Sequence, residues 1–161
     1  MQASPPKDSL SAQLSALLAE CETARSVFME GDPSASQPAW LPEGVLRDSE
    51  VGAIAKRLEP PRAALAILSA DWLQAAAKAR RLERDLASLR DLYAEGIVAI
   101  ADTECPLAPS QWRALGFRPW WHDADSGITL QGFNLYDYKQ RPDWLNAKYW
   151  ANPELWDVYR W

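Results

Sequence analysis

The chain has 161 residues, of which 48% are hydrophobic and 24% are charged, a composition typical of a folded globular protein and not of a disordered one. This length fits one domain, and a formal net charge of -5 argues against nucleic acid or an acidic membrane surface as a partner. No apolar run has the length of a signal peptide or a membrane span, so we expect a cytoplasmic protein whose Cys21 and Cys105 are reduced.

In the first half of the chain, apolar residues change from helical to strand-like spacing and back. Residues 1–8 form a polar lead that we expect to be flexible, and Asp8 or Ser9 can cap a helix over 9–24. The elements predicted next are a buried strand at 27–29, a long ordered loop at 33–47, a helix that opens at Asp48 or Ser49 and ends at Pro60-Pro61, and a buried strand at 63–68.

The second half contains the most regular stripe of apolar residues. The stripe predicts one long helix that is closed by Glu95-Gly96. Its apolar face consists of Ala75, Ala79, Leu82, Leu86, Leu89 and Tyr93. A buried strand at 97–101, a short helix at 110–115, and strands at 117–122 and 127–138 that pair as an antiparallel hairpin should follow. This order predicts a three-layer, Rossmann-like α/β fold whose sheet has a parallel centre and an antiparallel edge hairpin.

Basic residues on the long predicted helix do not change the argument about nucleic acid. Lys78, Arg80, Arg81, Arg84 and Arg90 alternate with Glu83, Asp85 and Asp91 at distances that allow pairing. We therefore interpret them as a solvated, salt-bridged face of that helix.

From Ala63 to Lys139 the sequence resembles the C-terminal half of class I S-adenosylmethionine-dependent methyltransferases. The resemblance depends on a buried strand with an aspartate at its end, a long helix ending in Leu89-Arg90-Asp91-Leu92, a strand at 97–101, and the segment Leu115-Gly116-Phe117-Arg118 before a final antiparallel pair. It implies a methyltransferase-like fold, and S-adenosylmethionine is the cofactor that it would imply. The whole chain also resembles a small family of uncharacterised bacterial proteins.

The first half departs from the methyltransferase pattern. That family places a glycine-rich loop after its first strand, whereas here the strand at 27–29 is followed by Glu30-Gly31-Asp32-Pro33-Ser34. One glycine followed by proline cannot form such a loop, and there is no room for the usual number of strand–helix units before Ala63. We therefore expect no cofactor, and if one binds, we expect it at Gly31, Asp32 and Asp71.

Each of the three buried strands is followed by an aspartate: Asp32, Asp71 and Asp102. The carboxyl ends of parallel strands form the ligand crevice of an open sheet, so these carboxylates could hold Mg²⁺, or one of them could bind ribose hydroxyls. The alternative is that they only cap turns and helices, which aspartate commonly does.

His122 is the only histidine, and it is a candidate general acid or base, although no nucleophile lies beside it in the sequence. One histidine and two scattered cysteines lack the spacing of a zinc site. Cys105 follows a strand end and is interpreted as an ordinary loop cysteine.

The tail at 142–161 is rich in aromatic residues and is predicted to form two short helices that pack on the domain. Trp144, Trp150, Trp156 and Trp161 either complete the core or leave rings exposed as a partner-binding surface. The sequence thus favours a non-enzymatic, methyltransferase-like domain that binds another protein or itself. The alternative is an enzyme, either a divergent methyltransferase or a metal-dependent one that uses the three aspartates.

Overall fold

The computed structural model describes residues 9–136 and arranges them around one 6-stranded sheet with the strand order β2-β1-β3-β4-β6-β5. Strands β2, β1, β3 and β4 are parallel, whereas β6 is antiparallel to both β4 and β5. The parallel centre and the antiparallel edge hairpin are therefore as predicted. The strands are β1 (Ser26–Met29), β2 (Leu46–Asp48), β3 (Ala63–Leu68), β4 (Ala94–Ala101), β5 (Arg118–Asp123) and β6 (Ile128–Asn134).

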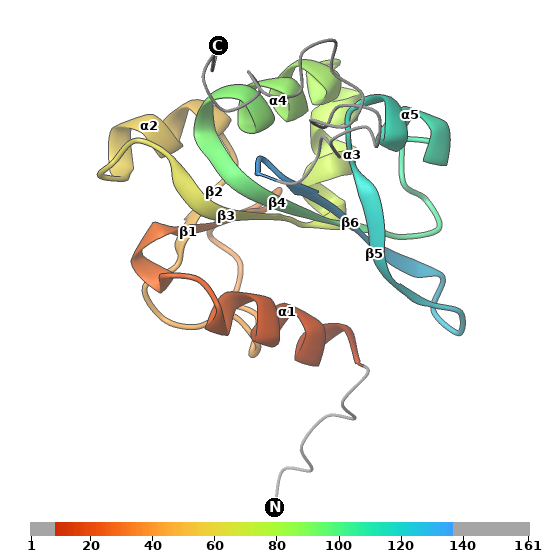
Figure 1. Ribbon diagram of the computed structural model, residues 1–161, viewed down its shortest axis with the longest axis horizontal. Coiled ribbons are helices and arrows are strands. Elements are labelled where there is room, and N and C mark those ends of the chain that lie inside the picture. The colour runs from red at the N-terminus through yellow and green to blue at the C-terminus, as the bar shows by residue number, and fades with distance from the viewer. Residues whose placement is uncertain (1–8, 137–161) are drawn as a thin grey trace, which may run out of the picture.

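Helices lie on both faces of the sheet, which gives three layers (Figure 1). Helix α1 lies on one face, and α2 to α5 lie on the other. The α-helices are α1 (Leu10–Ala19), α2 (Ile54–Arg57), α3 (Ala70–Lys78), α4 (Leu82–Ser88) and α5 (Pro109–Ala114). Two 3-10 turns, η1 (Thr23–Arg25) and η2 (Val51–Ala53), and one π-helical turn, η3 (Leu89–Tyr93), accompany them.

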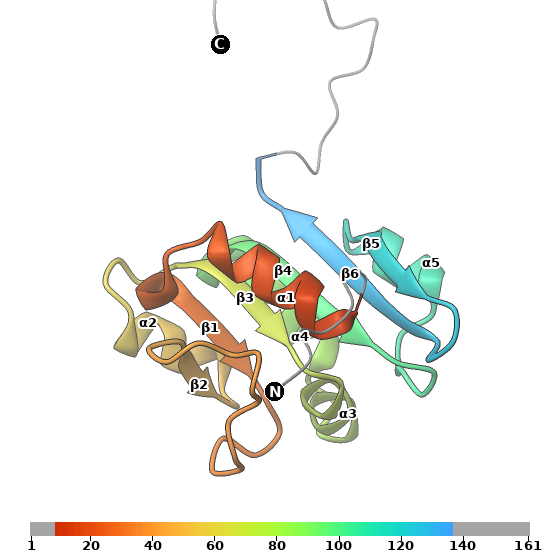
Figure 2. The same ribbon diagram turned by 90° about the horizontal axis from the view of Figure 1, so that it is seen from below.

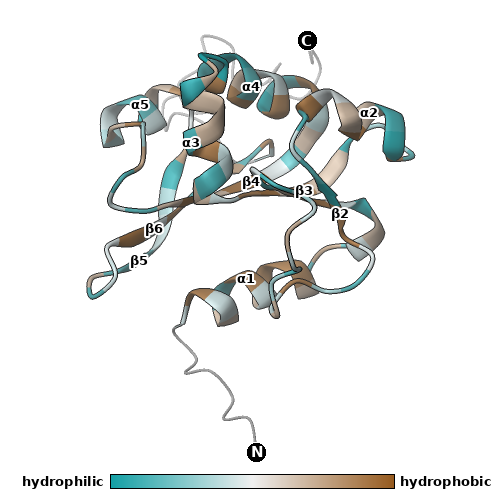
Figure 3. Cartoon of the chain, turned by 180° about the vertical axis from the view of Figure 1, so that it is seen from behind, coloured by the Kyte–Doolittle hydropathy of each residue, from teal (hydrophilic) through white to brown (hydrophobic). Residues whose placement is uncertain are grey.

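Each face of the sheet has its own apolar core. Between the sheet and α2 to α5 the largest fully buried side chains are Trp72, Trp112, Phe117 and Phe133. The core under α1 is smaller and contains Leu14 and Leu18 of that helix. Figure 3 shows the hydrophobic colouring concentrated along the central strands, as expected for parallel strands covered on both faces.

The layer that contains α1 is completed by a loop, not by a second helix. The loop between β1 and β2 buries Leu41 and Val45. The Trp40 ring packs edge-on against Phe28 of β1, with the ring centroids 5.3 Å apart. The predicted long ordered loop is thus confirmed, except that its last residues and the expected start of the next helix form β2 instead. Helix α1 is also shorter than predicted: Ser9 caps it, and it ends at Ala19.

The long helix predicted to end near Tyr93 is divided, and that prediction is wrong. Arg80 has a φ of 56°, which ends α3, and the chain starts α4 at Leu82. The break interrupts the 3.6-residue period, so Asp85, predicted on the solvated face, is buried against Arg81 at 2.5 Å. Gly96 lies inside β4 and does not close a helix; a Cβ there would lie 3.2 Å from a main-chain oxygen of β3.

The edge strand β5 is irregular. Its register with β6 shifts between Pro119 and Trp121, which is the mark of a β-bulge. The Trp120 ring lies directly over Gly132 of β6, where a Cβ would come within 1.9 Å of the ring. Strand β6 ends at Asn134, earlier than the predicted strand, of which the last residues lie outside the part of the chain that the structure describes.

Candidate functional site

The carboxyl ends of β1, β3 and β4 hold the three aspartates selected from the sequence. The Asp32 carboxylate accepts hydrogen bonds from the Ser34 hydroxyl at 2.5 Å and the Ser34 N–H at 3.0 Å. These bonds hold the pKa of Asp32 below its ordinary value. The Asp102 carboxylate likewise accepts the N–H of Glu104, two residues further on, at 3.0 Å. Both carboxylates thus serve the turns in which they lie.

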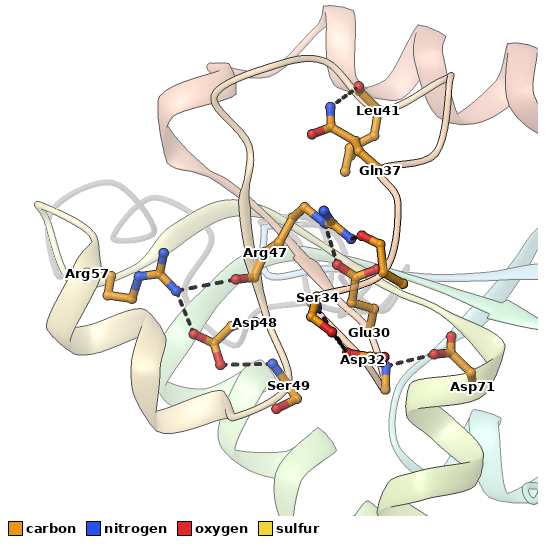
Figure 4. Close-up of polar contacts among 12 residues, drawn as sticks. Glu30, Asp32, Ser34, Gln37, Leu41, Arg47, Asp48, Ser49, Arg57 and Asp71 are labelled. Carbon is orange, nitrogen blue, oxygen red and sulfur yellow. Dashed lines mark hydrogen bonds and ion pairs between the residues drawn. The ribbon is translucent and has the colours of Figure 1, made fainter.

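Asp71 makes a longer connection. It lies in the first turn of α3, and its Oδ2 accepts the N–H of Gly31 at 2.8 Å, which joins the tips of β3 and β1 (Figure 4). A Cβ on Gly31 would lie 2.7 Å from the same oxygen. Glycine therefore allows the Asp71 carboxylate to approach the main chain this closely.

Asp32, Asp71 and Asp102 were one candidate set for Mg²⁺, with local capping of turns and helices as the alternative. Within residues 9–136 no group of three or more His, Cys, Asp or Glu side chains could hold a metal ion. The physical reason is that each of the three carboxylates is directed to a main-chain N–H on its own loop or on the neighbouring strand end.

The strongest contact at this edge is an ion pair that sequence reasoning missed. Glu30, directly after β1, is buried, and its Oε1 accepts a hydrogen bond from Arg47 Nε of β2 at 2.5 Å. This bond raises the pKa of Arg47 above its ordinary value. Arg47 also donates to the carbonyl of Ala35 at 2.7 Å, so it fastens the loop between β1 and β2 to the strand ends. A charged residue directly after a buried strand was the only signal of this pair in the sequence.

A similar arrangement stabilises the end of β2. Asp48 accepts the N–H groups of Ser49 at 2.8 Å and Glu50 at 3.0 Å, and it pairs with Arg57 at 2.7 Å. Burial by itself raises the pKa of Asp48, but these hydrogen bonds and the Arg57 charge outweigh it, so the pKa is lowered. Glu30, Asp48, Asp71 and Asp102, the carboxylates described at the ends of these parallel strands, are therefore all bonded to the protein itself.

Among the described residues, neither His122 nor Cys105 has a hydrogen-bond partner that would make it part of a catalytic pair. His122 Nδ1 is hydrogen-bonded to Thr129 Oγ1 of the neighbouring strand at 2.9 Å, on an exposed part of the hairpin. Cys105 is half-buried, and its N–H donates to the carbonyl of Asp102 at 3.2 Å, as expected of a loop residue.

The face of the sheet that carries α1 has a groove beside that helix. Figure 2 shows α1 lying across β3 and β4 and not across β6 and β5. A cavity of about 220 Å³ lies at this boundary, with Leu17 and Cys21 on one side and Trp120 and Tyr136 on the other. Trp120 is 40% exposed and Tyr136 is 77% exposed. Burial, and then the charge of Glu20, raise the pKa of the Cys21 thiol.

The tail that was predicted to carry partner-binding residues lies outside the described residues. This applies to Trp144, Trp150, Trp156 and Trp161, and to the two short helices expected at 142–161. Their role stays a prediction.

Comparison with known proteins gives the family and no activity. No curated protein and no solved structure matches the chain. Within residues 9–136, no helix is both long and apolar enough to cross a membrane. A family model matches residues 8–161, nearly the whole sequence, and the chain therefore belongs to DUF6231, a family of unknown function.

Proposed function

We propose that the chain is a non-catalytic, methyltransferase-like α/β domain of Rossmann-like build that acts by binding a protein, either a second copy of itself or another chain. The observation that carries the proposal is the closed set of polar contacts at the strand ends. Glu30 is bound by Arg47, Asp48 by Arg57, and Asp71 by the Gly31 N–H. A ligand entering there would have to replace these bonds, and loss of Arg47 would leave the buried Glu30 carboxylate without its partner, which is costly.

The last part of the sheet supports the methyltransferase-like build. Gly116 and Phe117 precede β5, and β5 and β6 form the antiparallel pair that the resemblance implies. The first half supports the absence of catalysis, because Gly31 is the only glycine between β1 and Gly44. The segment that follows β1 does not have the run of glycines that would let several main-chain N–H groups approach a cofactor.

The groove beside α1 is the surface that favours a partner. Aromatic residues are enriched at protein interfaces, and solvent-exposed rings beside an apolar cavity suit a partner side chain. Trp120 and Tyr136 provide such rings, next to Leu17 of α1. The groove includes residues on both sides of the boundary between α1 and β6, so a partner there would also fix α1 against the sheet.

The test is the oligomeric state of the full chain by sedimentation velocity across a wide concentration range. We expect association, and we expect Tyr136→Arg to weaken the dimer dissociation constant by about tenfold or more, as for an aromatic hot spot. Leu92→Arg is the matched control, because Leu92 is also an exposed apolar residue, at 60%, but belongs to η3, away from the groove. A monomer at every concentration, or equal effects of both variants, contradicts self-association through this groove.

The second candidate is a divergent S-adenosylmethionine-dependent methyltransferase, favoured by the parallel strands followed by the antiparallel β6–β5 pair. Thermal melting with millimolar S-adenosylmethionine separates the two candidates. The non-catalytic domain gains no melting temperature, whereas a ligand far above its dissociation constant stabilises the folded state by several degrees. In the methyltransferase case, Asp71→Asn should abolish the gain and leave the unliganded melting temperature nearly unchanged.

A further inference from the structure

The corner between α3 and α4 has an unusual residue at a position that favours glycine. Arg80 has a φ of 56°. Its N–H donates to the carbonyl of Ala77 at 2.9 Å, and the N–H of Arg81 donates to the carbonyl of Ala76 at 2.9 Å. This pair of bonds is a Schellman motif, in which glycine adopts the left-handed conformation without a steric penalty. An arginine at this position carries that penalty, which points to a use for its side chain.

Arg80 is one of the residues that line a cavity of about 410 Å³, a volume within the range of small-molecule sites. The cavity lies between the α3–α4 corner and the loop that follows β4, on the face of the sheet opposite α1 (Figure 1). Its wall has both cationic and apolar parts. The residues that form them include Arg80, Arg84, Leu82, Pro106 and Leu107.

One of the two guanidinium groups that line this cavity has no carboxylate partner among the described residues. Within residues 9–136 the Arg80 guanidinium has no ion pair. Arg84 donates from Nε and Nη2 to Asp85 Oδ1 at 3.3 and 3.2 Å, whereas Arg81 binds the other oxygen of that carboxylate at 2.5 Å and also lies 3.8 Å from Glu50. Glu83 is the one carboxylate in the lining, and it opposes two guanidinium groups. The lining thus has an excess of one positive charge, which Arg80 supplies, on a chain whose formal net charge is -5.

We propose that this cavity binds a small molecule that carries a phosphate group. The guanidinium groups of Arg80 and Arg84 donate hydrogen bonds to the phosphate oxygens, a geometry that favours arginine over lysine. Leu82, Pro106 and Leu107 contact the apolar part of the ligand. The site is independent of the groove that contains Trp120, so a ligand here and a partner there can bind to the same molecule.

The experiment is a titration of the ¹⁵N-labelled full chain with phenyl phosphate at constant ionic strength, followed by amide chemical shifts. Saturable shifts centred on the amides of Ala77, Arg80, Leu107 and Gln111 are expected. Benzoate is the comparison ligand, because it has the same ring and a single charge. Equal affinity for benzoate, or shifts without saturation or away from these amides, overturns the assignment.

Three variants test the roles of the charges. Arg80→Gln should weaken phenyl phosphate binding about tenfold, whereas the matched Arg113→Gln, an exposed arginine of α5 outside the lining, should leave it unchanged. Glu83→Gln should strengthen binding, because it removes the opposing charge. Equal effects of the two arginine variants overturn the proposal.

Arg80→Gly tests the role of the Arg80 side chain in a variant that is expected to fold well. It relieves the left-handed arginine, so we expect the melting temperature to rise by roughly 2–6 °C while binding falls. A rise in melting temperature with unchanged binding would mean that the Arg80 side chain does not contact the ligand.

Discussion

Replacing Gly31 by alanine tests the contact that joins β1 to β3. The new Cβ would lie 2.7 Å from Asp71 Oδ2, too close for any stable contact. Because the clash is with the end of a side chain, the Asp71 carboxylate can rotate away, and the cost is then the hydrogen bond to the Gly31 N–H. That bond is 2.8 Å long and exposed to solvent, so its loss should cost about 0.5–1.5 kcal/mol.

The same substitution also has a favourable effect through the unfolded chain. Gly31 lies outside the left-handed region, and alanine at such a position stabilises a protein by about 0.4–1 kcal/mol. In the wild-type protein the two effects nearly cancel. In an Asp71→Ala background only the gain is left, so Gly31→Ala becomes stabilising there. The two Gly31→Ala effects should differ by about 0.5–1.5 kcal/mol.

The assay is urea denaturation of the four proteins of this cycle, with the free energy of unfolding taken from two-state fits. Gly52→Ala is the control, because a Cβ at Gly52 meets nothing within 4 Å. It should stabilise the wild type and the Asp71→Ala protein equally. Additive effects of Gly31→Ala and Asp71→Ala, within about 0.3 kcal/mol, would refute the inferred contact between the strand ends.

Asp48→Asn should lower the free energy of unfolding by about 1–3 kcal/mol at pH 7. This loss should shrink as the pH falls through the lowered pKa of Asp48, because the carboxylate stabilises the fold only while it is ionised. Urea titrations at several pH values check this, with Glu43→Gln, at an exposed position, as the control. Gly132→Ala should displace the Trp120 ring, lower the free energy of unfolding by about 1–3 kcal/mol and change the tryptophan fluorescence; unchanged fluorescence would contradict the packing. The Cys21 thiol should react slowly with a disulfide reagent at pH 8 and faster after unfolding, because burial raises its pKa.

The sequence predicted the central strands well because their signal is local. The apolar runs at 63–68 and 97–101 need cover on both faces, and both lie in the parallel centre of the sheet. Strand β2 was missed because its three residues are only half-buried and include Arg47 and Asp48. The break at Arg80 was missed because the residues on either side of it continue the apolar stripe, and no glycine or proline marks the end of α3.

The candidate site was less predictable, because its contacts join distant parts of the chain. Asp32 and Asp102 follow β1 and β4, and Asp71 lies in the first turn of α3 after β3, but a place near a strand end does not determine where a carboxylate points. The pair of Glu30 and Arg47 depends on the parallel alignment of β1 with β2, which no spacing rule reveals.

The irregular edge strand limits how this domain can assemble. Pro119 offers no N–H, and the bulge beside it breaks the even row of main-chain donors and acceptors that an incoming strand from a second molecule would need. Stacking of copies into a continuous ribbon is therefore blocked at this end. A partner that approaches β5 therefore has to recognise side chains and not the main chain. The specificity of such a complex would depend on the indole rings of Trp120 and Trp121.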